Sequence, residues 1–303
     1  MREALALTGN IAVVVFTVTS LSTVGFSYRV SRILEPLRNV RQVFRALVCN
    51  FVLVPVLAIG IERMIPLDPP LAIGLFLLAG SAGAPFLIKL AQAAKSDIAL
   101  CAALLLLLVP STVVFLPFYV PMATADPSLR DLNYTPSSVL AIGAPLLSTL
   151  LVPLVLGLVT RAVAPRVAVR LAPVGRKLST LSLVVAVGSI FGANLPQFVG
   201  ILKTGAIPAA ALLIVGAFLI GFLISRRDTS SVLGLGTAQR NVAAAMVVAS
   251  QDFDDPGVLV MVTACVLTAL AVLFPISWLL SRQRPRVGLP IQGDGPDPVA
   301  RGA

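Results

Sequence analysis

The chain has 303 residues, of which 57% are hydrophobic and only 12% charged, and its mean hydropathy is +0.98. This composition excludes a soluble globular domain and indicates an integral membrane protein. The formal charge of +10 does not indicate a nucleic-acid partner, because the basic residues lie between apolar runs rather than along one polar face. The three cysteines lie inside apolar runs without metal-ligand spacing, so we expect neither a metal site nor a disulfide framework.

Apolar runs of roughly 20 residues, the length that crosses a bilayer, predict nine transmembrane helices. Residues 1–281 are therefore expected to form one transmembrane domain. The segment 282–303 is rich in Pro, Gly and Asp and is expected to be a disordered cytoplasmic tail. In chain order the runs cover residues 5–27, 46–64, 69–94, 97–121, 137–160, 178–200, 204–225, 229–250 and 257–280.

The basic residues predict the orientation of these spans. With the N-terminus outside, seventeen of the 23 Lys and Arg residues fall on the inside, four fall outside and two lie within spans. Cytoplasmic loops carry such an excess of positive charge, so we expect a multi-pass protein of the inner (plasma) membrane with a cytoplasmic C-terminus. The first span is expected to be retained, because its arginine cluster follows the apolar run, whereas a signal peptide carries its charge in front.

The third span, which contains "AGSAGAPFLIKLAQAAKSD", is not a clean helix. Gly80, Gly83 and Pro85 interrupt it, and a new half-helix is expected near Pro85 because proline suits the first helical position. Lys89 would lie one turn into this half-helix. Two interpretations of Lys89 stay open: it faces a cavity, or it snorkels to the cytoplasmic interface about 9 Å away.

The eighth span, which contains "GLGTAQRNVAAAMVVAS", shows the same features. Gly234 and Gly236 are expected to interrupt it, with Thr237 as the N-cap of a second half-helix and Arg240 at its start. A lipid-facing arginine costs about 2.5 kcal/mol or more at the bilayer centre, so Arg240 is expected to face the interior. Two roles stay open for Arg240: it binds a ligand, or it donates hydrogen bonds to the carbonyls of the broken helix. The glycines could also serve close packing between helices rather than a break.

Interrupted helices in two halves of a membrane protein indicate the binding site of a transporter, because unpaired backbone groups at membrane depth are tolerated beside a cavity. All acidic residues map to loops, span edges or the tail, so Lys89 and Arg240 have no predicted carboxylate partner. The simplest counter-charge is a substrate anion. The chain has no histidine, no G-x-S-x-G motif and no carboxylate at membrane depth, so we do not expect an enzyme.

Four stretches resemble the bile acid:sodium symporter family: "VGFS" at 24–27, "NFVLVP" at 50–55, "GSAGAPFLIKLAQAAKSDIAL" and "GTAQRNVAAA". The resemblance implies an all-α membrane protein of the nine-helix branch, with two inverted repeats at about 5–121 and about 137–281. It also implies a panel domain and a core domain, whose two broken helices cross near the substrate and ion sites.

The chain departs from the family pattern where the family binds sodium. A Ser-Asn pair of the first broken helix is replaced by "GAPFLIK", and no glutamate accompanies Gln239 and Asn241, which Arg240 separates. Asn50 stands where the family often has a glutamine that reaches an ion site. Because a hard cation requires several oxygen ligands, sodium remains possible as a bound ion but is not favoured.

We therefore predict a secondary transporter of a small organic anion that works by alternating access in the lipid bilayer, without a cofactor. Two alternatives stay open: a membrane ligand-binding sensor or scaffold without transport, and a genuine sodium symporter with a modified ion site. The patterns specify neither the anion, the direction of transport nor an oligomeric state. The expected substrate-binding residues are Arg240 and Lys89, which would attract the anion, and Gln239, Asn241, Thr237, Asn50 and Ser81, which would orient it or tie the crossing together.

Overall fold

The computed structural model describes residues 2–27, 37–124, 139–193, 195–201, 204–253 and 255–283. All regular secondary structure in these residues is helical. Eight helical segments are long and apolar enough to cross a membrane, as expected of a multi-pass membrane protein. Most of the predicted tail, residues 284–303, lies outside the described residues.

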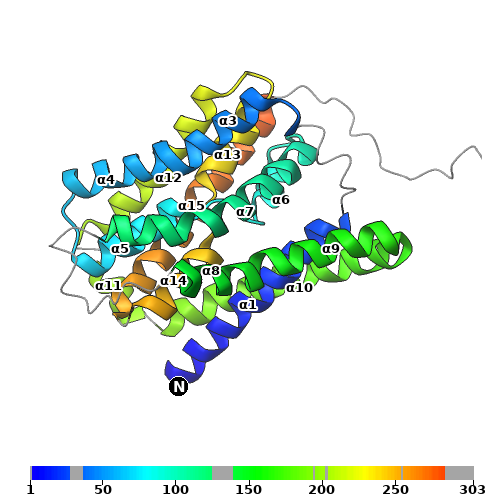
Figure 1. Cartoon of the computed structure of the whole chain (residues 1–303). Coiled ribbons are helices and arrows are strands. Elements are labelled where there is room, and N and C mark those ends of the chain that lie inside the picture. Colours follow the sequence, from blue (N-terminus) through cyan, green and yellow to red (C-terminus); the bar gives the residue numbers. More distant parts are fainter. Residues whose placement is uncertain are drawn as a thin grey trace, which may run out of the picture.

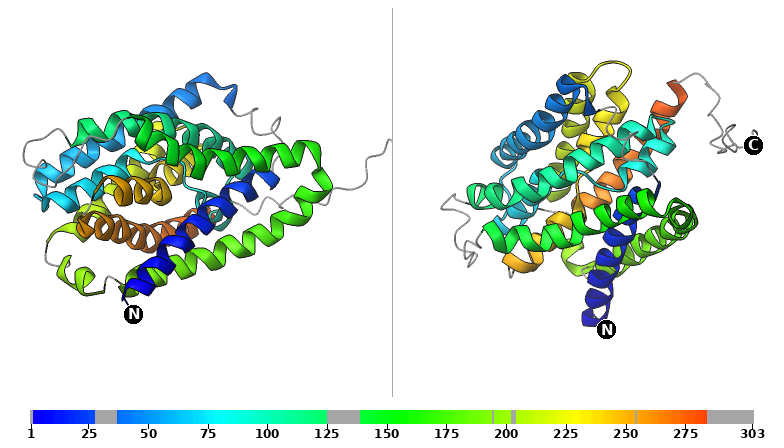
Figure 2. Two further views of the ribbon diagram at one scale, coloured as in Figure 1. Left: turned by 60° about the horizontal axis from the view of Figure 1, so that its bottom comes forward. Right: turned by 45° about the vertical axis from the view of Figure 1, so that its right-hand side comes forward.

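Three helices form a separate layer, which we call the panel layer. They are α1 (Arg2–Ser27), α9 (Val152–Val163) and α10 (Pro165–Ala193). Figures 1 and 2 show them together along one side of the molecule. A Cβ added at Gly25 of α1 would lie 2.6 Å from the backbone of Gly157 in α9. Glycines at this crossing therefore allow the two backbones to approach closely.

Ten further helical elements form the core layer around α13 and α14 in the described part of the chain. The segment Ser230–Ser250, which contains these two helices, is 89% buried, whereas the corresponding share for α10 is only 25%. α5 packs against α15, and α12 packs against α4, α13 and α15. The core layer comprises α3 (Val40–Val48), the π-helix η1 (Cys49–Leu53), α4 (Val54–Met64), α5 (Pro69–Gly80), α6 (Leu87–Ala93), α7 (Ile98–Ala123), α12 (Ala206–Ile224), α13 (Ser230–Ala238), α14 (Val242–Asp252) and α15 (Pro256–Gln283).

Three shorter helices adjoin α9 and α10 and contact the core layer. α8 (Val139–Leu146) and the π-helix η3 (Leu147–Leu151) lead into α9 and contact α7 of the core layer. α11 (Leu195–Ile201) follows α10 and contacts α15.

The second and sixth predicted spans begin too late in the chain. The second helix starts at Val40 rather than 46, because Asn39 caps it by accepting a hydrogen bond from the Gln42 amide at 3.3 Å. The sixth helix starts at Pro165 rather than 178, so the basic stretch predicted as a loop is helical. The physical reason is a sharp turn at Ala164, since a residue before proline avoids helical geometry and proline fits the first helical position.

The third predicted span is divided into two helices. α5 has 12 residues, and α6 has seven, so neither reaches the length of a membrane span. This division is why the structure has eight long apolar segments where the apolar runs predict nine.

The second break lies later in the chain than Gly234 and Gly236, which were wrongly predicted to cause it. α13 continues through both glycines to Ala238, and α14 begins at Val242 with Asn241, not Thr237, as its N-cap. A helical glycine costs roughly 1 kcal/mol, too little to end a buried helix. A Cβ at Gly234 would lie 3.0 Å from the Phe218 ring, so close packing explains this glycine.

Candidate functional site

The first helix break depends on glycines that no larger residue can replace without clashes. α5 ends at Gly80, where an added Cβ would lie 2.5 Å from the ring of Tyr119. Gly83 has φ +80°, a left-handed conformation that favours glycine, and its Cβ would lie 2.8 Å from the Val109 amide nitrogen. The break therefore lies directly against α7, and α6 begins at Leu87.

The two breaks cross and hydrogen-bond to each other. The Asn241 amide donates to the Ser81 carbonyl at 2.9 Å, and the Asn241 side chain donates to the Gly83 carbonyl at 3.1 Å. The same side chain accepts from the Ala244 amide at 3.2 Å and so caps α14. One asparagine thus satisfies backbone groups of both breaks, which would otherwise be buried without partners.

A hydroxyl group of α7 also holds the first break in place. Thr112 donates to the Ala82 carbonyl at 2.9 Å and accepts from the Ala82 amide at 3.0 Å. Thr112 was not among the predicted site residues, because a single threonine within an apolar helix carries no recognisable pattern.

Arg240 lies at the crossing and is 1% exposed. All five of its N–H groups donate to oxygen atoms of the protein. Nε donates to the Leu78 carbonyl at 3.1 Å, and Nη1 donates to Asn50 Oδ1 at 2.8 Å and to the Thr237 carbonyl at 3.2 Å. Nη2 donates to the Asn50 carbonyl at 3.4 Å and to the Ala79 carbonyl. A guanidinium has five N–H donors and no acceptor, so its hydrogen-bonding capacity is fully used.

These carbonyls are available because of the local helix geometry. Leu78, Ala79 and Thr237 lie in the last turns of α5 and α13, where carbonyls lack the usual partner four residues later and the helix dipole favours a cation. The Leu78 carbonyl also accepts from the Ser81 amide at 3.0 Å. Asn50 lies in η1, where a carbonyl bonds the amide five residues later. For Asn50 that residue is Pro55, which has no N–H, so the carbonyl is free to accept from Arg240.

The positive charge of Arg240 has no counter-charge in the part of the chain that the structure describes, because no carboxylate there forms an ion pair with it. Five neutral oxygens solvate the guanidinium instead. This arrangement satisfies its hydrogen bonds without neutralising its charge, so a net positive field persists at the crossing.

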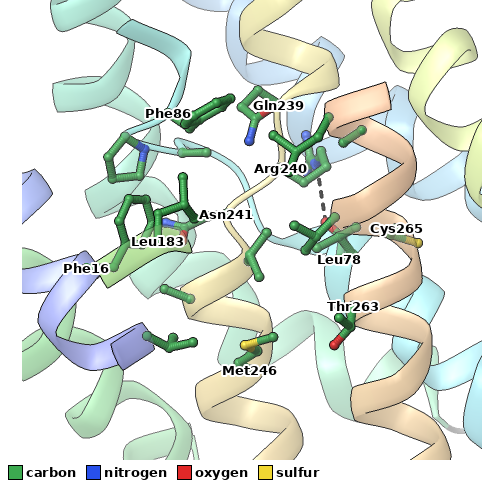
Figure 3. A pocket seen from close by; sticks show the side chains of 18 of the residues that line it. Phe16, Leu78, Phe86, Leu183, Gln239, Arg240, Asn241, Met246, Thr263 and Cys265 are labelled. Carbon is green, nitrogen blue, oxygen red and sulfur yellow. Dashed lines mark hydrogen bonds between the residues drawn. The ribbon is translucent and has the colours of Figure 1, made fainter. Parts of the chain in front are cut away.

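A cavity of about 790 Å³ of empty space, partly open, lies between the two layers at this crossing. Figure 3 shows Phe16 of α1 and Leu183 of α10 on the panel side, facing Asn241, Met246 and Thr263 of the core layer. Most of the lining is apolar, and its polar groups gather around the second break. Ligand sites of this kind combine an apolar wall with a few convergent polar groups.

Three hydrogen-bonding groups at the cavity lack protein partners. Gln239 is 7% exposed, lines the cavity, and its buried Oε1 has no partner among the described residues. The backbone amides of Ala84 and Ala243 also belong to lining residues, and neither donates a hydrogen bond within the described part of the chain. Buried polar groups without partners are rare in proteins, so this end of the cavity is suited to a polar ligand group.

The predicted site residues fall into three groups. Gln239, Arg240 and Asn241 line the cavity, while Asn50, Ser81 and Thr237 are fully buried behind it and support the crossing. Lys89 does not line the cavity: it is half-buried on α6 and donates to the hydroxyl of Thr180 on α10. Thr263 also lines the cavity but was not predicted, because no motif surrounds it in its apolar helix.

An all-helical membrane fold in which two broken helices cross beside a cavity is the architecture of a secondary transporter. The family model described as the Sodium Bile acid symporter family matches residues 13–201, which is more than half of the chain. The chain belongs to this family, whose members are transporters. The matched residues include Asn50, Ser81 and the first break, whereas Arg240 and the second break follow them. The comparison with curated proteins gives no match.

Proposed function

We propose that the protein carries a small organic anion by alternating access, with the panel layer and the core layer moving relative to each other. One observation carries this proposal: the cavity between the layers lies beside a buried arginine whose charge has no counter-charge among the described residues. An anion in this cavity would supply the counter-charge that Arg240 lacks among the described residues.

Arg240 contributes charge rather than direct hydrogen bonds, because its five donors are already used. The direct contacts to the anion come from N–H donors at the cavity, those of Gln239 Nε2 and of the Ala84 and Ala243 backbone amides. The Oε1 of Gln239, which has no partner among the described residues, is an acceptor and does not bond the anion. The two amides precede or begin the half-helices α6 and α14, where helix dipoles favour negative charge.

Arg240 also replaces a bound sodium ion in this proposal. Five oxygen atoms converge on the guanidinium, and a set of carbonyl oxygens is also what an alkali cation requires. A covalently attached cation attracts an anion as a bound ion does, but it cannot dissociate and so cannot transmit an ion gradient. Transport is therefore downhill, by exchange, or coupled to another ion.

Lys89 acts at the contact between the layers rather than in the anion site. Its hydrogen bond to Thr180 joins α6 of the core layer to α10 of the panel layer. Relative movement of the layers requires this bond to break. The bond is therefore specific to one conformation of the transport cycle.

Binding is tested by a thermal-shift screen of the purified protein against metabolite carboxylates. A ligand that binds only the folded state raises the unfolding temperature by mass action, so we expect at least one carboxylate to do so and its neutral amide analogue not to. Uptake of that carboxylate into proteoliposomes then separates a carrier from a sensor. Saturable binding without uptake would contradict the proposal.

We propose that the N-terminus is external and the C-terminus cytoplasmic, in the plasma membrane. Figure 1 shows the ends of α3, α15 and the connection between α12 and α13 at one end of the molecule. Arg282 lies 3.6 Å from the ring centre of Trp278 at the end of α15, and aromatic and basic side chains are enriched at membrane interfaces.

This topology predicts that a reporter fused after Arg282 is cytoplasmic. A reporter inserted within residues 126–131, which lie outside the described residues, is expected to be external. Accessibility to a membrane-impermeant label in intact cells measures both. Finding the two reporters on the same side would contradict the proposed orientation.

A further inference from the structure

A second, partly open cavity, with about 510 Å³ of empty space, lies at one end of the core layer. It is formed between the start of α3 and the connection between α12 and α13, which Figure 1 shows at the same end of the molecule. Its lining residues are Asn39, Arg41, Gln42, Arg45, Ser225, Arg226, Thr229 and Leu233.

Three arginines line this cavity, and two of them, Arg41 and Arg226, are exposed. Arg41 and Arg45 are four residues apart on one face of α3, a spacing at which like charges destabilise a helix. Arg226 adds a third guanidinium from the opposite wall. None of the three forms an ion pair with a carboxylate in the part of the chain that the structure describes. Net positive charge on a cytoplasmic loop explains the presence of arginines, but it does not explain why three of them line one cavity.

The other lining groups suit an oxyanion. The Gln42 side chain supplies an amide donor, and both α3 and α13 direct their N-terminal ends toward this region. The hydroxyls of Ser225 and Thr229 donate to the Arg226 carbonyl at 3.0 and 3.3 Å, and so hold the loop that carries Arg226. Arginine matches the oxygen geometry of phosphate through paired N–H groups. The combination therefore favours a phosphate group over a simple halide.

Exposed apolar residues next to this cavity indicate where such a phosphate group would come from. Val40 and Phe44 are 75% and 66% exposed on the face of α3 that adjoins the two arginines. Exposed apolar side chains continue along α4 and α12, which pack together below the cavity. A phospholipid could therefore place its headgroup phosphate between the arginines and its acyl chains against these side chains.

We propose that this cavity, defined by Arg41, Arg45 and Arg226, binds a phosphate group, supplied by an anionic phospholipid of the adjacent leaflet. α3 continues through η1 to Asn50, and α13 continues to Thr237, and both of these residues bond Arg240. A bound phosphate group therefore holds together the two elements that position Arg240. It stabilises the core layer without taking part in anion transport.

The test uses the full-length protein in nanodiscs and follows unfolding by the fluorescence of its single tryptophan. We expect phosphatidylglycerol to raise the unfolding temperature over pure phosphatidylcholine, and native mass spectrometry to show retained phosphatidylglycerol. Arg226→Gln and Arg45→Gln should each lower this retention roughly tenfold, because a charge-assisted contact is lost. Arg227→Gln and Arg38→Gln are matched controls, since these exposed neighbours do not line the cavity, and they should retain the lipid.

The stability of the same variants without anionic lipid distinguishes a binding role of Arg226 from a structural one. In pure phosphatidylcholine, Arg226→Gln should be at least as stable as the wild type, because it relieves repulsion among the three arginines. If inorganic phosphate stabilises the detergent-solubilised protein with the same dependence on Arg226 and phosphatidylglycerol does not, the site stands but its ligand is a soluble phosphate. Equal effects of Arg226→Gln and Arg227→Gln, or no stabilisation by either probe, would overturn the proposal.

Discussion

Arg240→Gln is expected to lower the unfolding temperature markedly and to abolish anion uptake. A glutamine side chain has two N–H groups where arginine has five, so at least three of the oxygens around Arg240 lose their donor. Each buried polar group left without a partner costs about 1–3 kcal/mol. The loss of stability should therefore be several kcal/mol, measured by thermal or denaturant unfolding. Arg63→Gln, at an exposed arginine, is the matched control.

Two further measurements on this position separate charge from hydrogen bonding. Arg240→Lys keeps the charge and loses some donors, so it should be intermediate in stability and retain part of the uptake. In Arg240→Gln the freed oxygens become available to a cation, so sodium should raise its unfolding temperature and leave that of the wild type unchanged. A glutamine variant as stable as the wild type, with normal uptake, would show that Arg240 has neither role.

Gln239→Leu is expected to lower the affinity for the transported anion by about ten- to a hundredfold, because a hydrogen bond to a charged group contributes about 1.5–3 kcal/mol. Its effect on folding should be small or favourable, since the buried Oε1 of Gln239 has no partner among the described residues. Binding by calorimetry and unfolding temperature check the two parts together.

Asn241→Leu is the contrasting control for this prediction. Asn241 bonds Gly83 and Ala244, so its replacement should reduce stability as well as transport. If Gln239→Leu binds the anion as the wild type does, or unfolds as readily as Asn241→Leu, then Gln239 supports the fold and does not contact the substrate.

The first helix break was predictable because its cause is local. Gly80, Gly83 and Pro85 disfavour a continuous helix by their own backbone properties, and α5 ends at the first of them. The second break has a different cause. Gly234 and Gly236 remain helical because they pack against aromatic and leucine side chains of other helices, and a cap at Asn241, bonded to the first break, defines where α14 begins.

The environment of Arg240 was predictable only in part. An arginine in an apolar span indicates burial beside polar groups, but its partners are mostly backbone carbonyls, which every residue carries and no motif identifies. Leu78 and Asn50 are 162 and 190 positions away in the chain, and only the crossing of the helices brings them together. The proline that frees the Asn50 carbonyl, Pro55, is visible in the sequence, but its effect depends on the π-helical geometry of η1.

In the proposed mechanism an attached cation, Arg240, takes the place of bound sodium. The decisive measurement is uptake of the identified anion into proteoliposomes with sodium replaced by potassium or choline at fixed pH and membrane potential. Initial uptake rates should stay unchanged in the three salts, because the positive charge at the crossing does not depend on an ion from solution. Uptake that collapses without sodium and is restored with saturable dependence on external sodium would contradict this mechanism and show that the chain retains a sodium site.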